Sequence, residues 1–237
     1  MSYQFKITQK EYELFHDEVR LNLLLQYSCN LAEAEQCVEE HPSNTLDSDI
    51  RAKVKLLNSL YSTRVMVEPM VKNIIDVAAN GDFETRLQKG DTKLVADIAQ
   101  IAKRDNFSFA TKYCALLAPD KYPIYDSLVW KFFCKLNELG FFDEKTNKKF
   151  EKIKEFRSNA YSDYVEIYNE FMDKSDIRKF AKSYTDVDKF LWSAIKVYML
   201  LKNSRVEKFL NQHLPNLLTS IIGSAIWHII SQIIFKI

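Results

Sequence analysis

Apolar residues recur every three or four positions along most of the chain, and this spacing predicts helices rather than strands. In the run 127–139, for example, Val129, Phe132 and Phe133 fall on one helical face, and Leu136 continues it. No stretch alternates apolar and polar residues strongly enough to require a sheet. We therefore expect an all-α protein.

Short breaks divide this pattern into successive helices. The chain has only four Gly and five Pro in 237 residues, so long runs contain no helix breaker. Thr185 and Asp188 have the spacing of a capping box and are expected to open the last strong helix. The expected helices are 7–27, 30–40, 46–60, 65–79, 92–103, 107–118, 127–139, 145–161, 163–171 and 185–201.

From Leu217 the chain repeats two apolar residues followed by two others. This repeat predicts an apolar helix whose stripe drifts around the axis, because four residues exceed the helical period. His228 and Gln232 lie within the stretch, and both are costly in hydrocarbon. We expect the tail helix to pack on its own domain or on another copy, with membrane contact as the alternative.

The net charge of +1 conceals an asymmetry along the chain. Residues 1–50 carry three Lys/Arg against ten Asp/Glu, and the remainder carries thirty against twenty-two. Charged surface helices often scatter in this way, but a basic body also suits phosphates. The first ten residues are polar and lack the apolar core of a signal peptide, which favours the cytoplasm.

The cysteines and histidines do not form a recognisable metal motif. Cys29, Cys37, Cys114 and Cys134 show neither a C-x-x-C pair nor zinc spacing, and the four histidines are scattered. We expect reduced thiols and no metal, iron–sulfur cluster or other cofactor.

Asp126 stands directly before the run 127–139 and just after a break that contains Pro119 and Pro123. It therefore occupies the N-cap position, beside unpaired backbone amides and the positive end of the helix dipole. The simplest interpretation is an ordinary N-cap.

A second interpretation comes from a resemblance. The segment Tyr122-Pro123-Ile124-Tyr125-Asp126-Ser127-Leu128-Val129 resembles the region around the catalytic aspartate of helix-hairpin-helix DNA glycosylases. It follows their order of aromatic or apolar, Pro, aliphatic, any, Asp, small, any, Val. Bacterial proteins of the 8-oxoguanine-glycosylase-like fold are similar over Phe107 to Val129, and the adenine glycosylase branch is also similar.

This resemblance implies an all-α fold of two helical lobes followed by an apolar C-terminal helix. The corresponding divisions are N-terminal helices 1–44, a glycosylase-like core with a helical hairpin at 45–140, a second lobe at 141–203 that closes on the N-terminal helices, and an extension at 204–237.

In the family, the aspartate stabilises the sugar cation formed as the glycosidic bond breaks, which would be the role of Asp126. Bifunctional members have a nucleophilic lysine where this chain has Ser108, so the resemblance implies a monofunctional enzyme. Lys112, one turn later, is a secondary candidate that we interpret as a surface or phosphate-binding lysine. Tyr125 and Trp130 are candidates for the base pocket, and Tyr113 and Tyr122 are further aromatic candidates.

The implied partner is double-stranded DNA that contains a modified base. The expected hairpin, 104–106, lacks the family's two glycines. Of the DNA-binding candidates there, Lys103 and Arg104 would hold a phosphate by charge, and Asn106 would supply the left-handed conformation. Tyr61 and Arg64 interrupt an earlier apolar pattern, where the family places the loop that fills the gap in DNA.

The implied reaction is hydrolysis that releases a base and leaves an abasic site, in repair or in defence against phages with modified DNA. Two alternatives remain open. One is an inactive module of the same fold that binds DNA or protein, and the other is a membrane-associated helical protein. Formation of abasic sites separates the first function from both alternatives.

Overall fold

A computed structural model describes residues 4, 6–16, 31–101 and 104–201. Helices make up nearly all of the regular structure in these residues, which confirms the all-α expectation. The exception is a two-residue antiparallel ladder between β1 (Gln100–Ile101) and β2 (Arg104–Asp105). Several expectations lie outside the described residues, namely the helical residues 17–27, Cys29, Lys103 and the extension from 204 onward.

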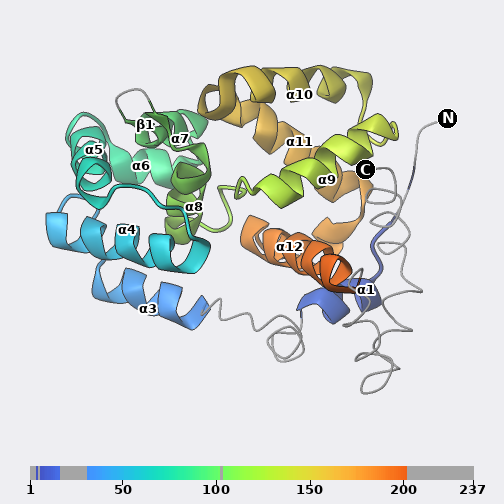
Figure 1. Ribbon diagram of the computed structural model, residues 1–237, viewed down its shortest axis with the longest axis horizontal. Coiled ribbons are helices and arrows are strands. Elements are labelled where there is room, and N and C mark those ends of the chain that lie inside the picture. Colours follow the sequence, from blue (N-terminus) through green and yellow to red (C-terminus); the bar gives the residue numbers. More distant parts are fainter. Residues whose placement is uncertain (1–3, 5, 17–30, 102–103, 202–237) are drawn as a thin grey trace.

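One group of helices forms the first lobe, on the left of Figure 1. Within it, α3 packs against α4 and α8, α5 packs against α4 and α7, and α7 packs against α8. The helices of this lobe are α3 (Leu31–Glu40), α4 (Asp47–Tyr61), α5 (Val67–Ala79), α6 (Phe83–Lys89), α7 (Thr92–Ala99) and α8 (Phe107–Leu117).

The second lobe lies on the right of Figure 1 and contains the later helices together with α1. Here α10 packs against α11, and α12 packs against both α1 and α9. The first two described helices, α1 and α3, thus belong to different lobes. The elements of this lobe are α1 (Gln9–His16), α9 (Ser127–Glu138), α10 (Glu144–Phe156), η1 (Arg157–Ala160), α11 (Tyr161–Lys174), η2 (Ile177–Lys179) and α12 (Tyr184–Leu201).

Two expected helices end early. The helix expected through Lys103 stops at Ala99, because Gln100 is extended and pairs with Asp105 in the ladder. The helix expected over 145–161 stops at Phe156, because Arg157 has a φ of 45° and a ψ of −110°. The short helix α6 was not expected, since its seven residues carry too little periodic signal.

The capping box expected from Thr185 and Asp188 is wrong. Helix α12 begins one residue earlier, and Asp186 accepts hydrogen bonds from the backbone of Lys182 and Ser183. The hydroxyl of Ser183 in turn accepts from the backbone N–H of Asp186. The apolar residues on one face of α12 are all buried, namely Val187, Phe190, Leu191, Ala194 and Ile195.

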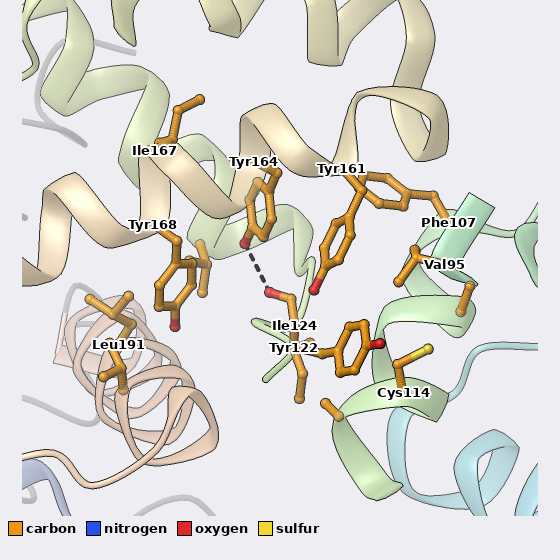
Figure 2. Packing of buried hydrophobic residues seen from close by; sticks show 14 of the residues in the cluster. Val95, Phe107, Cys114, Tyr122, Ile124, Tyr161, Tyr164, Ile167, Tyr168 and Leu191 are labelled. Atoms are coloured by element: carbon orange, nitrogen blue, oxygen red, sulfur yellow. Dashed lines mark hydrogen bonds between the residues drawn. The ribbon is translucent and has the colours of Figure 1, made fainter. Parts of the chain in front are cut away.

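The segment between α8 and α9 crosses from one lobe to the other, and its middle is buried. Tyr161 donates a hydrogen bond of 2.8 Å to the carbonyl oxygen of Pro123, and Tyr164 donates one of 2.8 Å to that of Ile124. Figure 2 shows both tyrosines descending from α11 onto this segment. These two hydrogen bonds fix the backbone just before Asp126.

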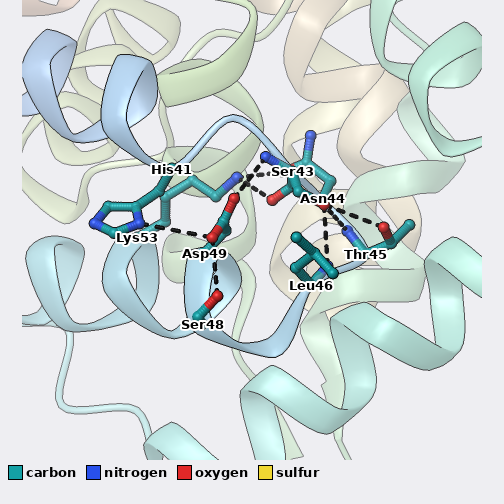
Figure 3. Close-up of polar contacts among 8 residues, drawn as sticks. All are labelled: His41, Ser43, Asn44, Thr45, Leu46, Ser48, Asp49 and Lys53. Atoms are coloured by element: carbon teal, nitrogen blue, oxygen red, sulfur yellow. Dashed lines mark hydrogen bonds and ion pairs between the residues drawn. The ribbon is translucent and has the colours of Figure 1, made fainter.

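The turn between α3 and α4 is organised by a buried lysine (Figure 3). The ammonium of Lys53 is fully buried and donates to the carbonyl of Ser43 at 2.8 Å and to the side-chain oxygen of Asn44 at 2.7 Å. Tyr113 of α8 donates to the same Asn44 oxygen, and the amide of Asn44 donates to Glu84. This network joins α4, α6 and α8.

No helix in the described ranges is both long enough and apolar enough to cross a membrane.

Candidate functional site

A pocket of about 690 Å³ lies between the two lobes. Four segments form its wall, two from each lobe, so the site exists only because the lobes meet. The loop after α4 and the start of α8 belong to the first lobe, whereas the start of α9 and the end of α10 belong to the second. The lining residues are Tyr61, Ser62, Thr63, Val65, Asp105, Asn106, Phe107, Ser108, Phe109, Lys112, Tyr125, Asp126, Ser127, Trp130, Ile153, Lys154 and Arg157.

Asp126 lines this pocket and caps α9, so its expected place at the helix start is confirmed. Its Oδ1 atom accepts hydrogen bonds from the backbone N–H of Leu128 at 2.7 Å and of Val129 at 3.4 Å. No hydrogen bond or ion pair within the described residues engages Oδ2. One carboxylate oxygen therefore fixes the side chain, and the other remains available for chemistry in the pocket.

Lys112 is not a surface residue, and our surface interpretation of it is wrong. Its side chain is only 4% exposed and lies on the pocket floor. The ammonium donates to the hydroxyl of Ser108 at 2.6 Å and to the carbonyls of Tyr125 at 3.2 Å and Ser108 at 3.4 Å. Burial lowers the pKa of Lys112, while the carboxylates of Asp126 and Asp188 oppose this shift.

Asp188 of α12 belongs to the same charged group and was missed as a site residue. Burial raises the pKa of Asp188 to about 7, the charge of Asp126 adds to the rise, and Lys112 opposes it. Its Oδ1 atom is buried without a hydrogen-bond partner in the described structure. Its position in the sequence could have revealed it, because Asp188 lies next to the buried Val187 and one turn before the buried Leu191, where a charged residue is unusual.

Aromatic rings form one side of the pocket. Tyr125 packs against Phe107 with ring centroids 4.5 Å apart and against Trp130 at 6.0 Å. Tyr61 is half-buried, and its ring lies 5.3 Å from the ammonium of Lys112. The structure thus brings Tyr61, Tyr125 and Trp130 together in the lining of one pocket.

The other two aromatic candidates do not reach the pocket. Tyr113 is fully buried against Asn44, and Tyr122 donates a hydrogen bond to the carbonyl of Arg86. Both residues therefore belong to the core of the first lobe.

The ladder between α7 and α8 contributes little to the pocket. Asn106 lines the pocket, and its amide donates to the carbonyl of Ala99 at 3.2 Å. The left-handed conformation expected at Asn106 is wrong, because its φ is −92°. Arg104 is exposed and is not part of the lining. Asp105 also lines the pocket, and its Oδ2 accepts hydrogen bonds from the backbone N–H and hydroxyl of Ser158.

Strained backbone occurs on both sides of the pocket. Ser62 and Arg64 have positive φ values of 50° and 56°, and Arg157 has one of 45°. Arg64 is exposed next to the lining residues Thr63 and Val65. Non-glycine residues held in this region raise the free energy of the fold and concentrate at functional sites.

Sequence comparisons match the N-terminal half of the chain. Residues 8–121 match the HI_0787_N family model, which is described as an N-terminal domain. An uncharacterized protein of Haemophilus influenzae is 30% identical over 120 residues, which is 47% of this chain. The aligned stretch covers 58% of that relative, less than two thirds of its length. No solved structure matches the chain.

Proposed function

We propose that this protein is a monofunctional DNA N-glycosylase of helix-hairpin-helix type that acts in the cytoplasm. It would hydrolyse the bond between a modified base and its deoxyribose in double-stranded DNA and leave an abasic site. The biological role would be either defence against phages with modified DNA or repair, and the substrate distinguishes the two. The observation that carries the proposal is the placement of Asp126, which caps α9 through Oδ1 and lines the same pocket as Tyr125 and Trp130.

The chemistry follows from the bond that breaks. As the base leaves with the bonding electrons, positive charge develops on C1′ and the ring oxygen of the sugar. A carboxylate held below the sugar stabilises that charge without having to reorganise. Water then adds to C1′ and loses a proton, and the departing base gains one. Asp126 would stabilise the cation and orient the water.

The pocket has the size and lining for an extruded nucleotide. Small-molecule sites generally enclose about 300–1,000 Å³, and the volume of 690 Å³ lies within that range. Stacking on aromatic side chains offsets the free energy needed to take a base out of the duplex, about a few kcal/mol. Tyr125, Trp130 and Phe107 would provide these stacking surfaces.

The test is abasic-site formation on plain DNA and on DNA from phages with modified bases. Wild-type protein should form abasic sites on a modified substrate. Asp126→Asn retains a capping oxygen but lacks the charge, so it should fold and bind DNA while forming few abasic sites. Asp82→Asn is a matched control, because Asp82 caps α6 through the backbone of Thr85 and does not line the pocket.

If Asp126→Asn were as active as wild type, the catalytic role would be wrong and Asp126 would be only an N-cap. If wild-type protein bound DNA but formed no abasic sites on any substrate, an inactive binding module would replace the enzyme.

A further inference from the structure

Arg157 has an unusual position at the rim of the pocket. It ends α10 in a strained conformation, with φ at 45° and ψ at −110°, and its exposed side chain lines the pocket. Most sequences avoid this conformation at a residue with a side chain, so an observed case calls for a functional explanation.

The strained turn is held from the opposite lobe. Asp105 of β2 accepts hydrogen bonds from the hydroxyl of Ser158 at 3.0 Å and from its backbone N–H at 3.3 Å. Gln100 of β1 donates to the side chain of Asn159 at 3.1 Å. Contacts on the two residues after Arg157 therefore keep its backbone in place and direct the side chain to the pocket.

The guanidinium of Arg157 is unpaired in the described structure, with neither a hydrogen bond nor an ion pair. The other two cations of the lining are engaged, because Lys154 pairs with Glu151 at 2.7 Å and Lys112 donates to Ser108 and Tyr125. Burial raises the pKa of the Tyr125 hydroxyl and the charge of Arg157 opposes this, so the guanidinium acts on the pocket's aromatic side.

We infer that Arg157 binds a backbone phosphate of the DNA strand whose nucleotide occupies the pocket, an inference that rests on the proposed function. A free guanidinium presents planar N–H groups that match two phosphate oxygens. Its place on the second lobe gives that lobe a phosphate contact of its own, apart from the ladder between α7 and α8. The strained turn positions the side chain before DNA arrives.

The experiment measures binding of the full chain to a duplex that contains a tetrahydrofuran abasic-site analogue, by fluorescence anisotropy over a range of salt concentrations. Each neutralised phosphate contributes roughly 0.9 to the slope of log affinity against log salt. Arg157→Gln should weaken binding and reduce that slope by about 1. Arg157→Lys should retain most of the slope, since the charge remains.

Two further variants separate this contact from general effects. Lys148→Gln removes an exposed charge from α10 that pairs with Glu144 outside the pocket lining, and it should keep the wild-type slope. Arg157→Gly suits the positive φ, so it should fold at least as stably as wild type while showing the reduced slope. Reduced binding therefore would not reflect unfolding.

If Arg157→Gln kept the wild-type slope of log affinity against log salt, the phosphate contact would be wrong, whether or not the variant bound DNA more weakly. Abasic-site formation by wild-type protein with either result would leave the enzyme proposal standing. A reduced slope without any abasic-site formation would support the contact and count against the enzyme. Wild-type protein without affinity for the duplex would overturn both.

Discussion

The ammonium nitrogen of Lys112 lies 2.6 Å from the hydroxyl oxygen of Ser108, one turn earlier in α8. If the proposed resemblance to helix-hairpin-helix glycosylases holds, Ser108 occupies the position of the nucleophile in bifunctional members, and the lysine side chain reaches that position. Its other two hydrogen bonds go to the carbonyls of Ser108 and Tyr125. An ammonium group has three N–H donors, and all three have acceptors here.

We expect this arrangement to keep Lys112 from attacking C1′, so the proposed glycosylase should be monofunctional. Borohydride reduction during turnover should then trap no covalent adduct between protein and DNA. Lys112→Met is the control, because it removes the amine and retains most of the apolar stem. An adduct that forms with wild-type protein and disappears in Lys112→Met would show that Lys112 is a nucleophile.

Asp188 predicts a pH dependence of stability. Burial raises its pKa from 3.8 to about 7, so the folded protein binds a proton that the unfolded chain releases. The stabilisation is complete below the unfolded pKa of 3.8 and is lost as the pH rises through about 7. Each unit of pKa displacement corresponds to about 1.4 kcal/mol.

Asp188→Asn removes this titration and should gain stability relative to wild type as the pH rises from about 4 to about 7, between the unfolded and folded pKa values. Urea denaturation at several pH values measures the difference in unfolding free energy. Asp76→Asn changes an exposed carboxylate of α5 and should follow the wild-type profile. If the unfolding free energies of Asp188→Asn and wild type changed with pH in parallel, Asp188 would not be protonated in the folded state.

Local signals were enough to place Asp126 correctly. The break at Pro123 and the apolar run after Ser127 are both adjacent to it, and N-capping depends only on such neighbours. The same holds for the apolar stripe of α12. These features were predictable because each lies within a few helical turns of the sequence that encodes it.

The surroundings of Asp126 were not predictable in this way. The burial of Lys112 depends on the packing of separate helices, and its charge interacts with Asp188, 76 positions along the chain. The break at Arg157 depends on Asp105, 53 positions before its partner Ser158. Because the charged and apolar spacing continues through Tyr161, periodicity alone predicted an unbroken helix there.

The loop after α4 allows a test of backbone strain with two serines. Ser62 has a φ of 50°, whereas Ser59 is an exposed residue inside α4. Glycine adopts positive φ without steric cost but weakens a helix interior. Ser62→Gly removes the steric cost of the positive φ in the folded state, but it also gives the unfolded chain more conformational freedom. The net change in stability should therefore lie between zero and a gain of about 1 kcal/mol.

Ser59→Gly should instead lower stability by about 0.5 kcal/mol. Thermal unfolding of both variants measures the contrast. Asn58 holds the loop through hydrogen bonds with Thr63 and both backbone groups of Val65, so Ser62→Gly should preserve its shape. Equal losses of stability in the two variants would show that Ser62 is not strained.

Asn44 is expected to be the most sensitive polar residue of the first lobe. Its side-chain oxygen accepts from Lys53 at 2.7 Å and Tyr113 at 3.2 Å, and its amide donates to Glu84 at 2.8 Å. Burial lowers the pKa of Lys53, because a buried site disfavours the charged form. Asn44→Ala should lower the free energy of unfolding by about 3 kcal/mol, because it leaves a buried ammonium short of an acceptor.

Tyr113→Phe removes only one hydrogen bond of this network and should lower stability by about 1 kcal/mol. Asn80→Ala, at an exposed position, should change it by less than about 0.5 kcal/mol. Urea denaturation ranks the three variants. If Asn44→Ala and Tyr113→Phe were equally destabilising, the ammonium of Lys53 would not depend on Asn44, and its bond to the carbonyl of Ser43 would be sufficient to hold the charge.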